Sequence, residues 1–328
     1  MSWTSQDLSK LDATASFHQV RLSEESQELT TFITPFGMFC FCRLLFVICS
    51  APEYFKRQMS RILKGQDGVV NMIDDILVFG SPQAEHDGRL EQVLNRLEAA
   101  GVKLNKAKCA FFPDKVKFLG VLVSSAGISP DPEKIQTLAD LKAPTNVSGV
   151  RRLLGMANHV GLFLPHLSDV TAPIRTLLKK SSAWYWGASQ QAAFNQLKSM
   201  FSLEASMAKY DPLYSTTVSA DAGSYGLGSV LLQDQRAGER RAVAYASRSL
   251  TSTEQRYSET EKEALAATCA VERFDQFMRG IKFDIESDHR PLLTLLGTAE
   301  LDLIPPRIQR LRMRLMRFQY QTLYVPGF

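Results

Sequence analysis

The chain has 328 residues, which at roughly 150 residues per domain indicates two or three domains. Hydrophobic residues make up 45% and charged residues 22% of it, and these proportions exclude disordered and low-complexity chains. A net charge of +4 neither requires nor excludes a polyanionic partner. The apolar runs fall far short of the roughly 20 residues that span a bilayer, so we expect an intracellular protein with no membrane partner.

The sequence contains five cysteines, an odd number, and no two of them form a Cys-x-x-Cys pair. A zinc site needs paired ligands at short spacing, and a disulfide scaffold would be denser in cysteine. The cysteines are therefore predicted to be buried free thiols in a reducing compartment.

Strand-like and helical segments alternate through the first two thirds of the chain. Residues 7–50 are predicted to form strands and turns, followed by a helix over residues 50–64 that starts at a serine cap. Residues 69–79 are apolar on both sides of a central Asp-Asp pair and indicate a hairpin. A second helix is expected over residues 83–100, then short strands and helices up to a domain boundary at 208–213.

The last third is predicted as three strands, a helix and a further strand, an order that indicates a mixed α/β sheet. A short helix, a basic helix and a final strand complete it. In chain order we expect strands at 215–220, 226–232 and 242–246, a helix at 258–278, a strand at 281–286, the basic helix at 305–318 and a strand at 319–325.

Two adjacent acids, Asp74 and Asp75, interrupt the apolar hairpin segment. The plain interpretation is a turn that happens to be Asp-Asp. The alternative is that adjacent acids at a tight turn present their oxygens to a hard divalent cation. Asp12, in a strand-like stretch, is the candidate third ligand, although an aspartate at a strand edge is more often a turn or cap residue.

Glu263 is the most informative acid of the last third. On the helix predicted there, the positions that share its side are two alanines and two phenylalanines, so the acid heads an apolar stripe. Ser258 and Glu261 have the spacing of a capping box, which explains Glu261 but leaves Glu263 without a structural role. An acid on a core-facing side costs free energy unless it is paired, metal-bound or neutralised.

Asp221 and Asp288 are ambiguous from the residues alone. Asp221 follows a predicted strand and precedes Ala-Gly, as a turn aspartate would. Gly226 and Gly228 form a G-x-G motif, but no Lys-Ser/Thr and no helix follow, so a phosphate-binding loop is not indicated. In the strand at 281–286, alternation places Asp288 on the same solvated side as the charged residues, Glu286 among them.

The predicted basic helix carries five arginines, and the residues alone leave two interpretations open. The arginines can form an ordinary solvated surface, or they can bind the phosphate backbone of a nucleic acid. They are Arg307, Arg310, Arg312, Arg314 and Arg317, and all except Arg312 fall on one face of the helix.

Motifs in matching order along essentially the whole chain resemble those of a known family. The first half contains KLDATASFHQV, VNMIDDILVFG and KVKFLGVLV, and the last third contains VSADAGSYGLGSVLLQ, YSETEKEALA and IESDHRPL. The chain resembles the reverse transcriptase–ribonuclease H part of gypsy-class LTR retrotransposon polyproteins, which are related to retroviral polymerases.

The resemblance implies a fold, a domain order and a function. It implies an α+β polymerase palm over residues 1–103, a thumb or connection region over residues 104–208, and an α/β ribonuclease H-like domain with a mixed sheet over residues 209–328. It implies RNA-directed DNA synthesis and hydrolysis of the RNA in RNA–DNA hybrids. It also implies a location in the cytoplasm, the nucleus or both.

For the polymerase, the resemblance implies that Asp12, Asp74 and Asp75 are catalytic carboxylates that bind two Mg²⁺ or Mn²⁺ ions. Two such ions stabilise the charge on the attacking and leaving oxygens of a phosphoryl transfer. The implied partners are an RNA template with a DNA primer, and deoxynucleoside triphosphates. Phe17 matches the aromatic residue that excludes the ribose 2′-hydroxyl, and Phe118–Gly120 resembles the turn that grips the primer end.

For the ribonuclease H, the resemblance implies that Asp221, Glu263 and Asp288 hold a second pair of Mg²⁺ or Mn²⁺ ions. This overrules the solvated-face interpretation of Asp288, and His289 fits the Asp-His pair of the family as a substrate-binding residue. The RNA–DNA hybrid would be recognised by its shape and its 2′-hydroxyls. Its backbone would contact Arg307, Arg310 and Arg314.

The sequence departs from the family pattern at three places. The fingers region that precedes Asp12 in the family is absent, and so is the helix that carries a fourth ribonuclease H acid after the final strand. Val47 stands where the family has a glycine that lets the backbone approach the nucleotide. We therefore expect impaired polymerase activity, with residual chemistry in the ribonuclease H domain. The alternative is a catalytically inactive, nucleic-acid-binding remnant of a retroelement.

Overall fold

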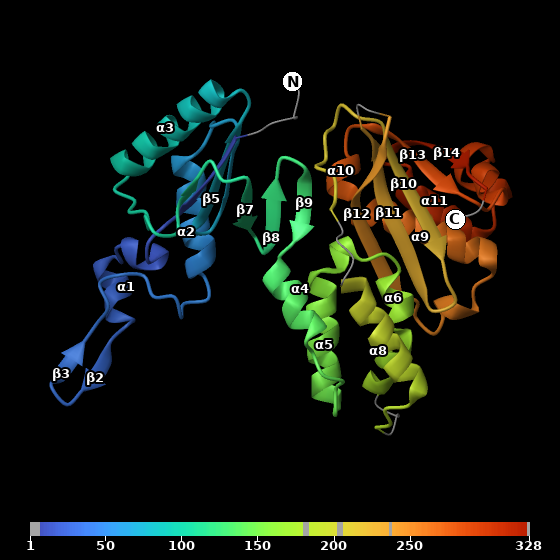
Figure 1. The fold of residues 1–328 in the computed structure, drawn as a ribbon, viewed down its shortest axis with the longest axis horizontal. Helices are drawn as coiled ribbons and strands as arrows, with labels where there is room; N and C mark the ends of the chain where they lie inside the picture. Colours follow the sequence, from blue (N-terminus) through green and yellow to red (C-terminus); the bar gives the residue numbers. More distant parts are fainter. Residues whose placement is uncertain (1–6, 180–183, 202–205, 236–237, 327–328) are drawn as a thin grey trace. The chain divides into compact units, whose positions relative to one another are not determined.

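The chain forms two compact units, Met1–Ser125 and Ala126–Phe328, whose elements are labelled in Figure 1. The computed structural model describes residues 7–179, 184–201, 206–235 and 238–326. Within these ranges no helix is long and apolar enough to cross a membrane. The predicted division into palm, thumb or connection, and ribonuclease H-like domains stays a prediction.

A four-stranded antiparallel sheet organises the first unit. Its strands, in spatial order, are β4 (Val69–Met72), β5 (Asp75–Gly80), β1 (Asp7–Asp12) and β6 (Ala110–Phe111). The hairpin predicted around the Asp-Asp pair is confirmed as β4 and β5. The turn between them includes Ile73, whose positive φ of 55° is unusual for a β-branched residue.

Two helices, α2 (Ala51–Ile62) and α3 (Gln83–Ala99), pack on one face of this sheet (Figure 1). Both confirm predicted helices at nearly the expected bounds. They enclose a core with the sheet residues Leu11, Ile76 and Val78, each of which has no exposed surface. Because side chains alternate along a strand, the residues next to these three on β1 and β5 point to the opposite face.

A smaller core lies on that opposite face. Leu8 and Leu77 of the sheet pack there against Phe118 and its neighbours in a hairpin formed by β7 (Lys115–Phe118) and β8 (Val121–Ser124). The two cores together account for the alternation of the central strands. The strip of the opposite face beyond Leu8 and Leu77 carries polar residues instead.

Two local predictions in the first unit are wrong. Ser50 accepts no capping hydrogen bond, because its backbone is already helical and its side chain cannot reach the amides of α2. Residues 7–50 also include a helix, α1 (Glu24–Glu28), which follows the capping side chain of Ser23 and is too short to show periodicity. β2 (Phe32–Thr34) and β3 (Gly37–Phe39) form a hairpin, as strands were expected in this region.

The cysteines are free, as predicted, but they are not buried. Cys40, Cys42 and Cys49 are exposed, while Cys109 and Cys269 are half-buried. The burial prediction relied on apolar neighbours in the sequence. Around the first three cysteines those neighbours are themselves exposed, so apolar sequence there does not mean an apolar interior.

The second unit begins with a short strand and a group of helices. Fully buried side chains such as Ile174 and Leu197 form part of the interior of this group. The elements are β9 (Gly127–Pro130), α4 (Pro132–Ala139), α5 (Val147–His159), α6 (Leu167–Val170), α7 (Ala172–Arg175) and α8 (Ala188–Phe201).

A five-stranded sheet forms the rest of the second unit, and it confirms the predicted mixed α/β sheet. The first three strands pair antiparallel, and the last two join in parallel. In spatial order the strands are β12 (Arg240–Ser249), β11 (Gly226–Asp234), β10 (Thr216–Ala222), β13 (Lys282–Ser287) and β14 (Gln319–Tyr324).

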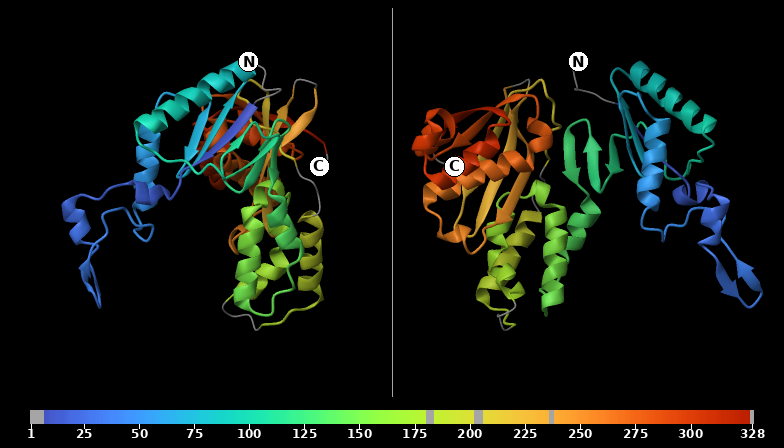
Figure 2. Two further views of the ribbon diagram at one scale, coloured as in Figure 1. Left: turned by 60° about the vertical axis from the view of Figure 1, so that its left-hand side comes forward. Right: turned by 180° about the vertical axis from the view of Figure 1, so that it is seen from behind.

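One long helix, α9 (Glu259–Arg273), lies across this sheet, as the view from behind in Figure 2 shows. The predicted capping box of Ser258 and Glu261 is present at its start. The helix ends earlier than predicted, at Arg273, and α10 (Asp275–Met278) follows it after Phe274. The basic helix α11 (Pro306–Leu315) packs against α9.

Short helical turns connect the main elements in both units. They are η1 (Ser16–Gln19), η2 (Gly161–Phe163), η3 (Thr176–Leu178), η4 (Glu254–Arg256), η5 (Leu293–Thr298) and η6 (Leu301–Leu303).

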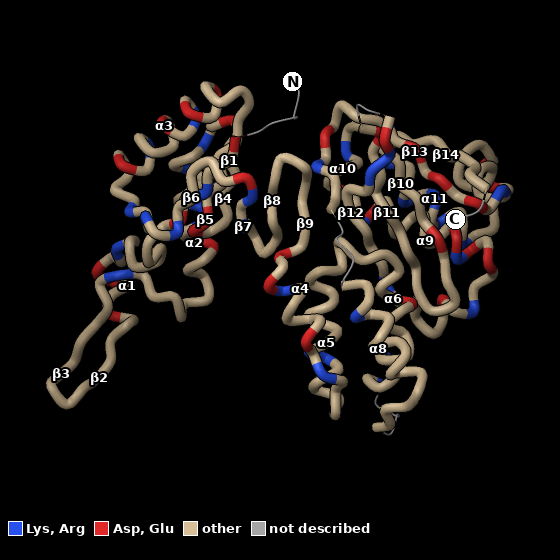
Figure 3. Tube along the Cα trace, viewed as in Figure 1, with Lys and Arg blue, Asp and Glu red and all other residues tan. Residues whose placement is uncertain are grey.

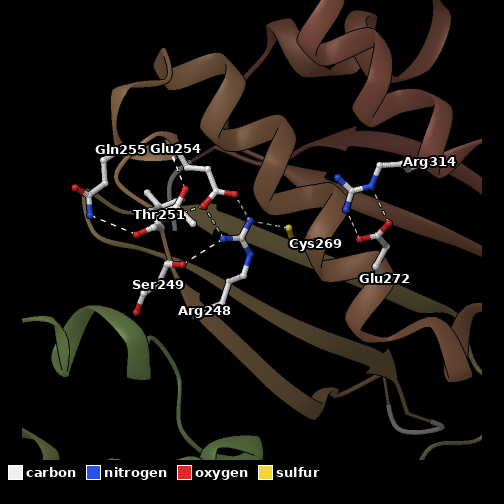
Figure 4. Close-up of polar contacts among 9 residues, drawn as sticks. Arg248, Ser249, Thr251, Glu254, Gln255, Cys269, Glu272 and Arg314 are labelled. Atoms are coloured by element: carbon white, nitrogen blue, oxygen red, sulfur yellow. Dashed lines mark hydrogen bonds and ion pairs between the residues drawn. The ribbon is translucent and has the colours of Figure 1, made fainter. Parts of the chain in front are cut away.

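An arginine-centred network ties the end of β12 to η4 and α9 (Figure 4). The guanidinium of Arg248 donates to both carboxylate oxygens of Glu254, at 2.9 and 2.8 Å, and to Cys269 Sγ at 3.3 Å. The amide of Thr251 also donates to Glu254. The bond from Arg248 is the main reason why the pKa of Glu254 falls from 4.5 to about 2.

We expect Glu254→Gln to lower the free energy of unfolding by about 1–2 kcal/mol at pH 7, a figure reduced for the partial exposure of Arg248. The depressed pKa means that the stabilisation is complete above pH 4.5 and is lost as the pH falls toward 2. The difference between variant and parent should therefore vanish near pH 2. Urea unfolding at a series of pH values measures it. Glu300→Gln, which changes an exposed glutamate, should show no such difference.

Candidate active sites

Two of the predicted polymerase carboxylates lie side by side on neighbouring strands of the first unit. Asp12 ends β1 and is directly opposite Asp75, which begins β5. Directly opposed residues of antiparallel strands point to the same face, with Cβ atoms roughly 5 Å apart. That face is the one opposite α2 and α3, because the neighbouring Leu11 and Ile76 point toward those helices. Asp74 precedes in the turn, and its carbonyl accepts from the amide of residue 13 at 2.9 Å.

Electrostatics show that these three acids interact. Asp12 is only 6% exposed, and its pKa is raised mainly by burial. Lys108 opposes this shift, while the charges of Asp74 and Asp75 add to it. The structure thus brings Asp12, Asp74 and Asp75 together as the sequence predicts.

Two lysines, neither of which the sequence singled out, partly neutralise this acidic group. Lys10 Nζ lies 2.8 Å from Asp75 Oδ1 and also donates to the carbonyl of Lys117 at 3.1 Å. Lys108 Nζ lies 3.7 Å from Asp12 Oδ2. Lys10 could have been found by strand alternation, because it precedes Asp12 by two residues and shares its face.

One of the three predicted substrate-binding positions in the first unit, Phe118, differs in detail from expectation. The side chain of Phe118 is 6% exposed and belongs to the small core, so it supports the turn rather than reaching a substrate. Leu119 and Gly120 form the two-residue turn with φ of 51° and 80°, and Leu119 is the exposed tip. A non-glycine residue with positive φ stores backbone strain of about 1–3 kcal/mol, which is more common at functional sites. Phe17 lies in η1 and packs edge-on against Phe55, with ring centroids 5.9 Å apart.

The predicted ribonuclease H carboxylates come from three elements of the second unit. The strands β10 and β13 run parallel, and the last pair in their register joins Ser219 to Glu286. Asp221 and Asp288 each lie two residues beyond that pair: Asp221 is the last residue but one of β10, and Asp288 directly follows β13. Continued alternation places the two side chains on the same face of the sheet. The two strands end there, and Glu263 approaches from α9.

Glu263 occupies a buried position between these strand ends. It is 6% exposed, its Oε1 accepts from the amide of Ala222 at 3.3 Å, and its Oε2 has no partner among the described residues. Burial, followed by the charge of Asp221 and more weakly that of Asp288, raises its pKa from 4.5 to about 7. The structure therefore brings the three predicted acids together.

His289 is held beside this group rather than being free in solvent. Its Nε2 lies 2.9 Å from the hydroxyl of Thr260 on α9, and its amide donates to Ser287 Oγ at 3.0 Å. Thr260 is three residues before Glu263 on the same helix. His289 thus fixes the segment that carries Asp288 against the start of α9.

The prediction for Glu286 is wrong: strand alternation placed it on a solvated face. Its side chain is 5% exposed and pairs with Arg240 on β12 at 2.6 Å. The face of β13 that carries Glu286 is therefore covered at this position rather than solvated, which alternation along one strand cannot show.

Two of the four arginines of the basic helix α11 hold it on α9. Figure 3 shows acidic and basic positions close together there. Arg307 donates to Glu261 at 2.6 Å, and Arg314 pairs with Glu272 (Figure 4). Arg310 alone of the three predicted contact residues has no ion-pair or hydrogen-bond partner in the described part of the chain. Phosphate binding by the other two would have to compete with these pairs.

Both acidic groups offer the donor type that magnesium and manganese prefer, which is carboxylate oxygen. The unpartnered Oε2 of the buried Glu263 also fits a site that a cation completes. However, no group of three or more His, Cys, Asp or Glu side chains within the described ranges is tight enough to hold a metal ion as it stands. Side-chain movement would therefore have to accompany metal binding.

Comparison with family models divides the chain in the same way as these two sites. Residues 2–123 match the family described as reverse transcriptase (RNA-dependent DNA polymerase). Residues 186–285 match the RNase H-like domain found in reverse transcriptase. The first match contains Asp12, Asp74 and Asp75. The second contains Asp221 and Glu263, and Asp288 lies three residues beyond its end.

Curated relatives align with nearly the whole chain. The retrovirus-related Pol polyprotein from transposon opus of Drosophila melanogaster is 32% identical and aligns over 97% of this chain and 33% of its own length. That from transposon 297 of the same organism is 30% identical over 97% and 30%. The transposon Tf2-3 polyprotein of Schizosaccharomyces pombe is 29% identical over 97% and 24%. The chain thus spans at most about a third of these relatives.

Solved structures show the fold. The foamy viral protease-reverse transcriptase dRH in complex with double-stranded DNA has a TM-score of 0.85 at 19% identity, over 99% of this chain and 58% of that one. The same viral protein in complex with an RNA/DNA hybrid has a TM-score of 0.83 at 20% identity, over 99% and 44%. The predicted fold class, a palm and thumb or connection followed by a mixed-sheet α/β domain, is confirmed.

We expect Glu263→Gln to stabilise the metal-free protein at pH 8 by up to about 3 kcal/mol. The pKa of this buried acid is raised from 4.5 to about 7, so between these pH values the folded parent holds a proton that the unfolded chain has lost, and at pH 8 the folded parent must bury a charge. The free energy of unfolding of the parent therefore falls as the pH rises from 4.5 to 7, whereas glutamine has no charge to bury.

Urea unfolding in EDTA at pH 4.5 and pH 8 tests this expectation. The two proteins should differ at pH 8 and converge at pH 4.5. Glu53→Gln, at an exposed position of α2, serves as the matched control. A parent that is as stable as the variant at pH 8 would show that Glu263 carries no burial cost.

Proposed function

Because the chain belongs to the reverse transcriptase family over residues 2–123 and to the RNase H-like family of reverse transcriptases over residues 186–285, we propose that it performs two reactions. These are RNA-directed DNA synthesis and hydrolysis of the RNA in RNA–DNA hybrids, as part of a gypsy-class retrotransposon Pol polyprotein. The observation that supports this most directly is the convergence of two separate groups of three acids, each from distant parts of the sequence.

In the second unit, Asp221, Glu263 and Asp288 would hold divalent metal, which domains of this kind generally use. Two Mg²⁺ or Mn²⁺ ions would, when bound, supply an activated water and stabilise the charge that develops on the leaving oxygen. The chain contributes positions: Glu263 keeps an unpartnered oxygen in a buried place, and His289 anchors the segment of Asp288 to α9.

In the first unit, Asp12, Asp74 and Asp75 would hold a second pair of metal ions. Until metal arrives, Lys10 and Lys108 limit the repulsion among these carboxylates. The hydrogen bond from Lys10 to the carbonyl of Lys117 also ties this strip of the sheet to the β7–β8 turn. We assign that turn, with Gly120 and the exposed Leu119, to contact with the primer, and Phe17 to selection against the ribose 2′-hydroxyl.

The proposed partners are an RNA–DNA hybrid, an RNA template with a DNA primer, and deoxynucleoside triphosphates. The viral protein of similar fold is in complex with double-stranded DNA in one structure and with an RNA/DNA hybrid in another, which supports nucleic acid as a partner here. The corresponding regions would be the palm at 1–103, the thumb or connection at 104–208 and the ribonuclease H-like domain at 209–328. The cysteines are free, as suits a place of action in the cytoplasm, the nucleus or both.

We expect purified protein to cleave the RNA strand of a labelled RNA–DNA hybrid in Mg²⁺ or Mn²⁺, and Asp221→Asn to slow cleavage on the order of a hundredfold or more. EDTA should abolish cleavage in the parent. Cleavage that is equally fast with EDTA, or in Asp221→Asn, would contradict the assignment of a metal-dependent site to these acids.

We expect primer extension on an RNA template to be lost to a similar extent in Asp75→Asn, because that change removes a carboxylate from the other group. The two variants control each other on the same preparations. Asp75→Asn should keep hybrid cleavage, and Asp221→Asn should keep whatever extension the parent shows. Parallel loss of both reactions in either variant would argue against two separate sites.

A second candidate function is a catalytically inactive protein that binds nucleic acid. It is favoured by the finding that neither acidic group in the described ranges is tight enough to hold metal as it stands. Affinity for a hybrid that falls steeply with salt, without cleavage in Mn²⁺, would select this candidate.

A further inference from the structure

The G-x-G motif of Gly226 and Gly228 has no role in the function proposed above, and the structure explains it as a docking surface. The segment 166–169, at and before the start of α6, lies against the β10–β11 hairpin end. A Cβ atom added at Gly228 would lie 2.8 Å from Nδ1 of His166. One added at Gly226 would lie 2.9 Å from Cβ of Ser168. A side chain at Gly226 would therefore push the backbone of the segment away, and one at Gly228 would displace the imidazole of His166.

The docked segment is firmly fixed. Leu167 is 3% and Ser168 1% exposed, and the helix that they begin contacts both β11 and β12. Thr171, which is fully buried, donates from its hydroxyl to the carbonyl of Leu167 at 2.6 Å. The position of the side chain that follows Ser168 is thus set by packing on either side of it.

That next side chain is Asp169, and it lies at the acidic group of the second unit. Added Cβ atoms at Gly223 and Gly226 would lie 2.9 and 3.0 Å from its Oδ1. Its carboxylate accepts hydrogen bonds from the amides of Tyr225 and Gly226. Since Gly228 is directly opposite Asp221 in the register of β10 and β11, the docked segment covers the same face of the sheet from which Asp221 projects.

Asp169 also senses the charge of Asp221, which raises its pKa beyond the larger effect of burial, while His166 acts in the opposite direction. Asp221 therefore has acidic neighbours on two sides, Glu263 and Asp169. A backbone-capping role alone would not require a charge here, because a neutral asparagine could accept the same amide hydrogen bonds. Like charges at such a place cost free energy unless a cation offsets them.

We propose that Asp169 supplies an additional carboxylate to the divalent-cation site at Asp221, and that the glycines of the β10–β11 hairpin end exist to admit it. The proposal rests on the function proposed for Asp221, Glu263 and Asp288, and it extends that site to an element that precedes the five-stranded sheet in the sequence. The unpartnered Oε2 of the buried Glu263 independently indicates that a cation belongs in this group.

The test is to titrate Mn²⁺ into the metal-free protein without nucleic acid. Binding is measured as the loss of the electron paramagnetic resonance signal of the free ion. All proteins carry Asp75→Asn, so that the titration reports the second unit. We expect Asp169→Asn to weaken Mn²⁺ binding about tenfold, as substitutions around metal sites commonly do. Gly226→Ala should have a similar effect, because its Cβ atom would lie 2.9 Å from Cβ of Ser168 and push the segment away while leaving Asp169 in the sequence.

Controls separate charge from folding and this proposal from the one on which it rests. Asp302→Asn removes an equal charge from an exposed position and should bind Mn²⁺ like the parent. Asp169→Glu should bind Mn²⁺ more tightly than Asp169→Asn. If the two variants have the same thermal midpoint, a merely structural role for Asp169 would not predict this difference. If either Asp169→Asn or Gly226→Ala binds Mn²⁺ like Asp302→Asn while Asp221→Asn does not, the proposal is overturned and the site remains. If Asp221→Asn also binds like the parent, the metal site itself is refuted.

Discussion

The central constraint on this molecule is that two groups of carboxylates are held close together, and that one member of each, Asp12 or Glu263, is only 6% exposed. Such an arrangement opposes folding, because burial and mutual repulsion both disfavour the charged form. The rest of each unit supplies the stability that tolerates it. In the first unit the sheet is closed on one side by α2 and α3, and in the second by α9, whose apolar face includes Glu263 at one end. Packing of the helices on the sheets fixes the backbone, and the backbone in turn fixes where the acidic side chains lie.

The two units meet this constraint in different ways. In the first, Lys10 and Lys108 offset the charges of Asp75 and Asp12, so the acids stay partly compensated without metal. In the second, no lysine or arginine is among the causes that shift the pKa of Glu263, and its value rises to about 7. The second group therefore has more to gain from a cation. This difference in local compensation is a physical reason to expect the two sites to respond differently to metal and pH.

The sequence predicted the elements well wherever period and length were clear, as for α2, α3, α9 and the hairpin around Asp74. It predicted Glu263 from an acid on an apolar helix face, with no need of the strands that meet it. It could not predict the burial of Glu286, because alternation separates the two faces of a strand but does not show whether the polar face is exposed to solvent. It also failed for the exposed cysteines, because an apolar stretch of sequence says nothing about which other element comes to cover it.

Asp169 illustrates a kind of residue that local patterns cannot reveal. In the sequence it is one acid in a short polar stretch, more than fifty residues before Asp221, and nothing in its spacing connects the two. The available signal was indirect: the glycines at 223, 226 and 228 had no phosphate-binding context, yet each lacks a side chain on the same face as Asp221. Glycine spaced by two along a strand weakens it and implies that something approaches closely. What approaches here is a segment that carries a carboxylate, so the motif is better understood as a contact surface for an acid than as a loop for a phosphate.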